Sequence, residues 1–410
     1  MKILVYEHAS GGGYAGEPID LSILSEGYGM LRCLVADLKA AGNEVTVLLD
    51  GRISSLNPPI AADYVIPLFH AGESKQFLAN AAKINDAVYV IAPETGRTLE
   101  TFVLLAGQTG GVSLNCEASA IRLAADKTIL YQTLKDYGLC TPKTVIFGAG
   151  ISLDKVKSVI KNNLTYPLVF KPSDSVSCGG LSVVKEEGQI GNAIRKVMSK
   201  SLGGRFVVQE FIKGEAVSVS LLCTDEGAFS MSLNKQNLKL ASPEGVSSYI
   251  GGVVPFDHVL RDASFKMAEK AATSFPGLRG YVGVDLVLAE EVPYVVDVNP
   301  RLTTSYIGLS RVAGFNVGEA IINAVLNGKL HTRLKSNGFA WFSKVESSKP
   351  SVNFFQKAAH LSGVISPPFP LSDSAKSISM VAGYGESVGE AKRGFEEAKK
   401  RFINIISGGK

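Results

Sequence analysis

The chain has 410 residues and a mass of 43.5 kDa, enough for more than one domain at the usual size of about 100–200 residues. Hydrophobic residues make up 46% and charged residues 20%. No apolar run approaches the roughly 20 residues of a membrane span, so we expect a soluble protein without membrane contact. The net charge of +4 is scattered, without a basic run, which disfavours nucleic acid and suits a small anionic ligand.

Cysteine usage and the first residues indicate the compartment. The five cysteines are far apart and form no Cys-x-x-Cys pair, so we expect reduced thiols rather than disulfides or a zinc site. Met1 leads directly into a strand-like segment, without an apolar targeting region. Both observations predict a cytoplasmic protein.

Residues 1–115 alternate between strand and helix patterns. Strands are predicted at Ile3–Tyr6, Glu44–Leu49, Tyr64–Pro67 and Ala87–Ile91, and helices at Ile23–Ala41 and Ser74–Ile84. This alternation predicts an α/β domain with a parallel sheet flanked by helices.

A glycine-rich loop follows the first strand. Residues Gly11 to Gly16 match G-x-G-x-x-G, and Asp50 ends the second strand, so an NAD-dependent dehydrogenase is one alternative. However, Glu17 and Pro18 follow directly, and Asp50 lies well beyond the usual interval of about 20 residues. A loop that shapes a small-molecule cleft is the preferred interpretation.

Residues 116–205 form a second predicted domain. A helix carries Lys127, and the strand Leu168–Pro172 carries Lys171 and leads into a polar loop that ends at Gly179 and Gly180. No Gly-Lys-Ser/Thr follows, so the loop is not a P-loop. Its backbone N–H groups are nevertheless suited to close over phosphates.

Residues 206–330 are predicted to form a third, strand-rich domain, and residues 331–410 an appendage. The predicted elements are strands Arg205–Phe211, Ala216–Cys223 and Ala228–Leu233, helix Asp262–Ser274, and, beyond a less regular region around Trp341, strand Ser377–Ala382 and helix Val388–Phe402. We expect the appendage to close the site or to make a subunit contact.

Two aspartates on one predicted hairpin, Val282–Arg301, carry most of the functional interpretation. With the turn centred on Glu291, Asp285 lies opposite Asp297, at a Cβ separation of about 4.5–5.5 Å. Asp297, Asn299 and Arg301 then share one face. Like charges this close are unfavourable unless a cation lies between them, and carboxylate and amide oxygens suit magnesium. A solvated hairpin with acids facing water is the alternative.

Taken in order, these motifs resemble the ATP-grasp superfamily of carboxylate–amine ligases over about residues 1–330. The motifs are Lys127, Lys171-Pro172 with its glycine loop, Gln209-Glu-Phe-Ile-x-Gly, Asp285 and Asp297-x-Asn-Pro-Arg301. The resemblance implies a Rossmann-like N-terminal domain and two α+β subdomains that enclose ATP. Four further runs are similar to the tyramine–glutamate ligase family of methanofuran biosynthesis: Glu7-His-x-x-Gly-Gly, Ser25-Glu-Gly-Tyr-Gly-Met30, Ile91-Ala-Pro-Glu94 and Asp297 to Tyr306.

The resemblance also implies roles for individual residues. The implied ATP contacts are Lys127, Lys171, Gly179, Gly180, Gln209, Glu210, Phe211, Ile212 and Glu215. Asp285, Asp297 and Asn299 would hold two Mg²⁺ ions, with Mn²⁺ as a substitute, and Arg301 and Lys171 would act in catalysis. The sequence departs from the common pattern in two places: Ala216 stands where a ribose-binding glutamate is usual, and position 297 is aspartate where glutamate is commoner.

The substrates implied by the resemblance are a glutamate-like amino acid and a tyramine-like primary amine, joined through an acyl phosphate. Expected substrate contacts are Glu7, His8, Ser10, Gly12, Glu94, Asn234, Gln236, Arg301, Thr303, Thr304 and Ser305. No catalytic base is evident in the sequence. A non-catalytic ATP sensor is a further functional alternative. We also expect a homodimer, for which the sequence indicates no interface residues.

Overall fold

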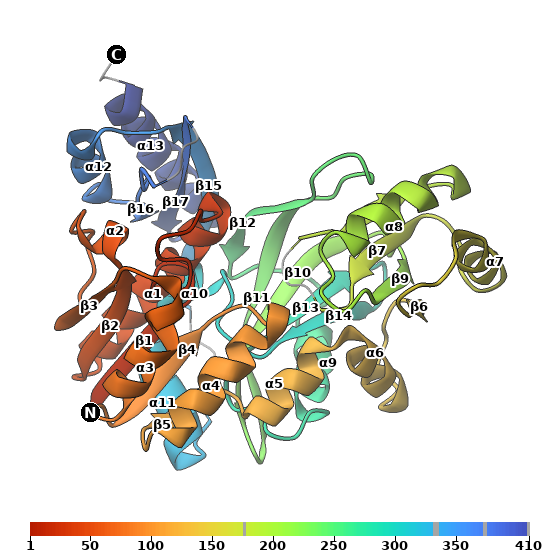
Figure 1. Ribbon diagram of the computed structural model, residues 1–410, viewed down its shortest axis with the longest axis horizontal. Coiled ribbons are helices and arrows are strands. Elements are labelled where there is room, and N and C mark those ends of the chain that lie inside the picture. The colour runs from red at the N-terminus through yellow and green to blue at the C-terminus, as the bar shows by residue number, and fades with distance from the viewer. Residues whose placement is uncertain (175–177, 331–335, 372–374, 408–410) are drawn as a thin grey trace.

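The computed structural model describes residues 1–174, 178–330, 336–371 and 375–407. Three β-sheets form its framework, of five, four and eight strands. Figure 1 shows the five-stranded sheet and the four-stranded sheet on opposite sides of the molecule, with strands of the largest sheet between them. Within the described residues, no helix combines enough length and apolarity to cross a membrane.

The N-terminal sheet is parallel, with the strand order β3-β2-β1-β4-β5. Its strands are β1 Lys2–Glu7, β2 Glu44–Asp50, β3 Tyr64–Leu68, β4 Ala87–Ile91 and β5 Val112–Ser113, and its helices are α1 Leu21–Ala40, α2 Gly51–Ser54, α3 Ser74–Ala82 and α4 Thr98–Gln108. Apolar runs make β1 and β4 almost fully buried, as strands covered on both faces require. The predicted parallel sheet is therefore confirmed.

The second sheet is antiparallel, with the order β6-β9-β7-β8. This lobe contains β6 Thr144–Phe147, β7 Leu168–Pro172, β8 Ser182–Val184, β9 Phe206–Glu210, α7 Leu153–Asn163 and α8 Ile190–Met198, and it follows α5 Ala118–Ala125 and α6 Lys127–Asp136. Stacked rings of Phe147, Phe206 and Phe170 form its centre. The lobe therefore has its own core and carries Lys171 on β7.

The third sheet is antiparallel and has the order β14-β13-β10-β11-β12-β15-β17-β16. Its strands are β10 Glu215–Thr224, β11 Gly227–Lys239, β12 Ser248–Val254, β13 Gly280–Leu288, β14 Pro293–Asn299, β15 Phe339–Ser348, β16 Val364–Ser366 and β17 Lys376–Gly385. Its helices are α9 Arg261–Thr273, α10 Tyr306–Val312, α11 Val317–Asn327, α12 Val352–Ala359 and α13 Val388–Ser407. Together the three sheets give a mixed α/β architecture.

The C-terminal region differs from the sequence expectation. Residues after 330 are predicted to be irregular around Trp341, and this is wrong, because β15 runs through that residue and pairs with β12. The partner strand β12 carries Gly251 and Gly252, which weaken any strand pattern in the sequence. The pairing joins residues 339–348 to the same sheet as Asp285. The boundaries of the four predicted domains stay a prediction.

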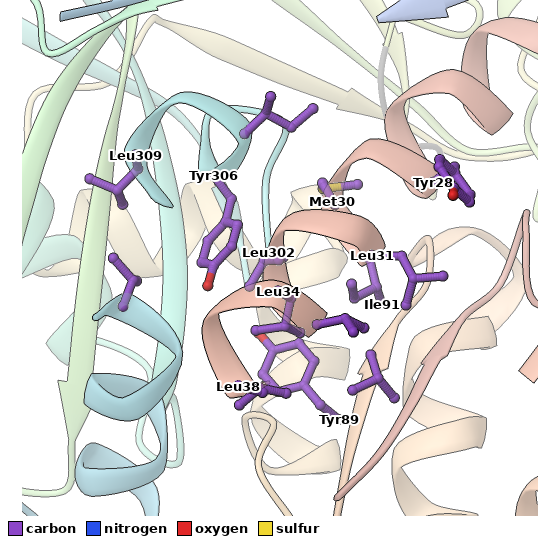
Figure 2. Close-up of a cluster of buried hydrophobic side chains, with 14 of the residues drawn as sticks. Tyr28, Met30, Leu31, Leu34, Leu38, Tyr89, Ile91, Leu302, Tyr306 and Leu309 are labelled. Atoms are coloured by element: carbon purple, nitrogen blue, oxygen red, sulfur yellow. The ribbon is translucent and has the colours of Figure 1, made fainter. Parts of the chain in front are cut away.

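Helix α1 attaches the N-terminal sheet to the large sheet. Figure 2 shows Leu31, Leu34 and Leu38 of α1 in one buried cluster with Tyr89 of β4 and Tyr306 of α10. Each fully buried side chain of this size stabilises the fold by about 1.5–3 kcal/mol. The N-terminal sheet is therefore fixed against the elements that carry the site.

Asp37 on α1 gives this contact a pH dependence. It accepts a 2.6 Å hydrogen bond from the Tyr306 hydroxyl, and burial raises the pKa of Asp37 to about 7 from 3.8. The folded protein keeps the proton to higher pH than the unfolded chain does. This stabilising contribution is complete below about pH 4 and is lost as the pH rises to about 7.

Replacing Asp37 with asparagine should remove that dependence. The quantity to compare is the free energy of unfolding of D37N minus that of wild type. This difference should be about 2–3 kcal/mol larger at pH 8 than at pH 5. Denaturant unfolding at both pH values measures the difference. Asp63→Asn is the control, because Asp63 is exposed and its pKa is lowered by a hydrogen bond from Lys39. An equal effect of D37N at both pH values would contradict the assignment.

Candidate active site

One pocket collects eleven of the predicted site residues. It lies among α1, the loop after β7, strands β10, β11, β13 and β14, and the segment before α10. Predicted residues that line it are Lys127, Lys171, Gly179, Gln236, Asp285, Asp297, Asn299, Arg301, Thr303, Thr304 and Ser305. Residues far apart in the chain, such as Lys127 and Asp297 at a separation of 170 positions, thus meet at one site.

The β13–β14 hairpin has the predicted register at the functional positions. Asp285 pairs with Asp297, and Gly283 pairs with Asn299. A register shift follows Asp285, so the symmetric pairing about Glu291 holds only on the side of the hairpin that carries the acids. The predicted opposition of the two aspartates is therefore confirmed.

The two aspartates are held close despite their like charges. Gln236 Nε2 donates to Asp285 Oδ1 at 2.9 Å, and Asn299 Nδ2 donates to Asp285 Oδ2 at 3.1 Å. Burial, and after it the charge of Asp297, raises the pKa of Asp285 to about 6, while these two hydrogen bonds oppose the shift. A bound cation would relieve this repulsion directly.

Two lysines bring positive charge to the acid pair. Lys127 Nζ donates to Asp297 at 2.7 and 2.9 Å, and its side chain is only 8% exposed. Burial lowers the pKa of Lys171 to about 8, against the opposing effect of Asp297. Lys171 therefore stays mostly cationic at neutral pH. Both lysines face the same pocket, an arrangement suited to phosphate oxygens.

The donor set fits a magnesium ion. Asp285 and Asp297 offer carboxylate oxygens and Asn299 an amide oxygen, which are ligands of a hard cation. Within the described ranges, no group of three or more His, Cys, Asp or Glu side chains is placed to hold a metal ion. Any ion held here would therefore depend on the amide, on substrate oxygens or on water for its remaining ligands.

Arg301 forms a buried ion pair across the domain contact. Its Nε donates to both carboxylate oxygens of Glu94, at 2.9 and 3.0 Å. The side chains of Arg301 and Glu94 are 14% and 6% exposed. Glu94 follows β4 at the carboxyl edge of the parallel sheet, where open α/β sheets bind ligands. Arg301 therefore enters the pocket in an orientation fixed by the N-terminal domain.

The structure does not bring Glu7, His8, Ser10 and Gly12 to the pocket. Both oxygens of Glu7 accept hydrogen bonds from the chain just after it, from Ala9 N, Ser10 N and Ser10 Oγ. Burial lowers the pKa of His8 to about 4, and its Nδ1 lies 3.0 Å from the Tyr6 hydroxyl. These groups are occupied in shaping the first loop, so their substrate role has no support from the geometry.

Several of the implied ATP contacts are also bonded to other residues of the protein. Phe211 N donates to Pro167 O at 2.9 Å, so this N–H is not free for a base, in contrast to the expectation from the motif. Gln209 donates to Thr144, and Glu210 accepts from Thr165 N. Glu215, another implied ATP contact, forms an ion pair with Lys235. Ala216, by contrast, lines the pocket.

The remaining predicted residues lie beside the pocket. Gly180 has φ +79°, and a Cβ there would be 2.9 Å from Pro172 Cγ, so the turn after Gly179 requires glycine. Residues 175–177 of the same loop lie outside the described residues. Asn234 is buried behind Ser218, which lines the pocket, and its Nδ2 donates hydrogen bonds to the hydroxyls of Ser218 and Ser220.

The glycine loop does not have the features of a dinucleotide site. Helix α1 begins at Leu21 behind the cap residue Asp20, not at Gly16. Asp50 is 1% exposed and binds Arg52, whose guanidinium donates to the carbonyls of Tyr14 and Glu17. Asp50 is therefore committed to holding the loop rather than a ribose.

Sequence analysis missed several residues of the pocket. Glu26, Cys178, Leu181, Ser218 and Tyr249 also line it. Glu26 could have been predicted, because it lies in the Ser25 to Met30 run and is the only acid in the first half of α1. Tyr249 lies on β12, whose pattern gave no signal.

Comparisons with known proteins agree with this geometry. A model described as an ATP-grasp domain matches residues 124–305, and one described as a pre ATP-grasp 3 domain matches residues 43–121. The chain is 27% identical over 354 residues to the tyramine–L-glutamate ligase of Methanocaldococcus fervens, covering 82% of this chain and 98% of that one.

Solved structures share the fold at low sequence identity. An ATP-grasp superfamily protein from Archaeoglobus fulgidus has a TM-score of 0.63 and 22% identity, over 93% of this chain and 99% of that one. Biotin carboxylase from Campylobacter jejuni has a TM-score of 0.73 and 17% identity, over 99% and 95%. These structures support the fold alone, whereas the domain matches and the ligase relative support the activity class. The chain therefore belongs to the ATP-grasp superfamily and is an ATP-dependent ligase.

Proposed function

We propose that this ligase joins the carboxylate of a glutamate-like amino acid to a tyramine-like primary amine through an acyl phosphate, releasing ADP and phosphate. The observation that carries the proposal is the convergence of Lys127, Lys171, Arg301 and the Asp285–Asp297 pair on one pocket. A protein that only senses ATP needs neither the paired acids nor the arginine, so this set favours catalysis over the sensor alternative.

The chemistry explains why these charges are needed. A carboxylate resists attack by an amine because it is negative and resonance-stabilised, so phosphorylation first converts it into an acyl phosphate. The amine then attacks the acyl carbon, the bond from carbon to the phosphate oxygen breaks, and phosphate leaves. The protein acts mainly by positioning the reactants and by neutralising charge on the transferring group.

We assign roles on this basis. Lys171 and Lys127 would bind phosphate oxygens, with Lys127 exchanging Asp297 for a phosphate. Arg301 would steady the transferring phosphoryl group. Asp285, Asp297 and Asn299 would hold Mg²⁺, proposed as two ions with Mn²⁺ as a substitute; when bound, the metal neutralises and orients the triphosphate.

The substrate assignment depends on the relative from Methanocaldococcus fervens. That protein is a tyramine–L-glutamate ligase, and it matches 82% of this sequence. Thr303, Thr304 and Ser305 offer hydroxyl groups beside Arg301, where polar substrate groups would lie. A cytoplasmic location and a homodimer belong to the same proposal.

A thermal-shift titration tests nucleotide choice. ATP with Mg²⁺ should raise the melting temperature by a few degrees, because a ligand at 100 times its Kd stabilises the native state by about 2.7 kcal/mol. NAD should have no effect. Stabilisation by NAD and none by ATP would favour the dehydrogenase alternative.

A screen of ADP release over amino acids and amines then tests the reaction. ADP should appear only when both a carboxylate substrate and an amine are present, with glutamate and tyramine as the expected pair. Mass spectrometry should find the amide product. ATP binding without substrate-dependent ADP release would favour the sensor, and dependence on bicarbonate would indicate a carboxylase instead.

A further inference from the structure

An ion pair from opposite ends of the chain meets at the pocket and has no part in the proposed ATP chemistry. Lys344 on β15 forms a salt bridge with Glu26 on α1, and their side chains are 12% and 18% exposed. Lys344 Nζ also donates to Ser22 Oγ at 2.6 Å and lies 5.7 Å from the centre of the Tyr249 ring. The pair is therefore fixed by contacts on α1, β12 and β15.

Glu26 is the member of the pair that lines the pocket. Its Oε1 accepts from Lys344, and its Oε2 accepts a 2.6 Å hydrogen bond from Thr304 Oγ1. Each oxygen of an ionised carboxylate accepts about two hydrogen bonds. Glu26 therefore keeps acceptor capacity while its orientation is fixed on both oxygens.

The charge of Glu26 is unsuited to phosphate. The proposed phosphate contacts, Lys127, Lys171 and Arg301, are all cations, and a carboxylate beside them would repel ATP. Lys344 and Thr304 compensate the desolvation of this carboxylate within the protein. The acceptor capacity that remains on Glu26 suits a substrate that brings a cationic donor to the pocket.

We propose that Glu26 binds the ammonium group of a substrate, with Lys344 as the residue that positions its carboxylate. This inference rests on the proposed function, which requires an amine and an amino acid, both of which carry an ammonium group in solution. The chemistry is the same for the acceptor amine and for the α-ammonium of the amino acid, and the experiment below distinguishes the two.

The first test compares ligands that differ only in the amino group. Thermal-shift and calorimetric titrations would use tyramine against 4-ethylphenol, and L-glutamate against glutarate, each with ATP and Mg²⁺ present. Wild type should prefer the amino member of one pair by about 10- to 100-fold, the range for a hydrogen bond to a charged group. Glu26→Gln should lose that preference, and the pair affected identifies the substrate.

The second test uses steady-state kinetics. Glu26→Gln should raise the KM of the same substrate about 10- to 100-fold and change the KM of ATP by less than about twofold. Lys344→Met should raise the same KM by a smaller factor, and Lys344→Arg should restore it. The matched control is Glu346→Gln, which breaks the exposed Glu346–Lys376 pair on the same strand as Lys344.

A double variant, Glu26→Gln with Lys344→Met, guards against misfolding because it leaves no unpaired buried charge. It should melt near the wild-type temperature and still lack the ammonium preference. The inference would be overturned if wild type and Glu26→Gln bound both amino ligands with equal affinity. It would also be overturned if Glu26→Gln lost affinity for ATP to the same extent as for the amino ligand, or if wild type bound neither amino ligand. If wild type binds these ligands but produces no ADP, the proposed function is wrong. The binding comparison then still shows whether Glu26 binds the ammonium group.

Discussion

Replacing Asp285 with asparagine is expected to lower kcat by about three orders of magnitude. Loss of a metal ligand removes several kcal/mol of charge stabilisation, and each 1.4 kcal/mol corresponds to about tenfold in rate. The new amide would also place a donor among Gln236 Nε2 and Asn299 Nδ2, which now donate to the carboxylate. ADP release at saturating substrates, measured over a range of Mg²⁺ concentrations, tests this expectation.

The D285N substitution should not reduce the stability of the fold. The substitution removes a carboxylate whose burial, and after it the repulsion from Asp297, raises the pKa of Asp285. This gain should outweigh the hydrogen bond from Gln236 or Asn299 that the new amide donor loses. The free energy of unfolding of D285N without nucleotide should therefore equal or exceed that of wild type, as is common where a site is built for function rather than stability. Asp262→Asn is the control, because Asp262 is 76% exposed on α9. A D285N enzyme with activity within tenfold of wild type would exclude Asp285 from the metal site.

Local patterns in the sequence were sufficient for much of this structure. The hydrophobic runs of β1 and β4 and the opposition of Asp285 and Asp297 depend on residues close in the chain, so period and turn position predict them. The same argument explains the correct expectation for the ATP-grasp fold, since its motifs are short and ordered along the chain.

Long-range pairing set the limit of prediction. Glu94 and Arg301 are 207 residues apart, and Lys344 lies 322 residues from Ser22. No periodicity relates such positions. Strand β12 was missed because Gly251 and Gly252 interrupt its pattern, and without β12 nothing indicated that β15 joins the sheet. The surroundings of His8 lay outside sequence reasoning for a related reason, because burial beside Tyr6 is a tertiary property.

Replacing Arg301 with alanine is expected to lower kcat by about two to three orders of magnitude, the usual effect of removing one donor that stabilises a charged transition state. The same change should destabilise the fold, because it leaves Glu94 buried without its partner. Breaking a buried ion pair in this way costs about 3–5 kcal/mol. Activity and denaturant unfolding must therefore be measured on the same preparations.

A double variant separates the effect on activity from the effect on stability. Replacing both residues, Arg301→Met with Glu94→Gln, removes the unpaired charge, so most of the lost unfolding free energy should return. Turnover should not return, because the guanidinium that faces the pocket is still missing. Recovery of activity together with stability would mean that Arg301 only anchors the N-terminal domain through Glu94. Stability without activity would instead locate its main role on the transferring phosphoryl group, since the buried contact with Glu94 fixes the guanidinium before substrate arrives.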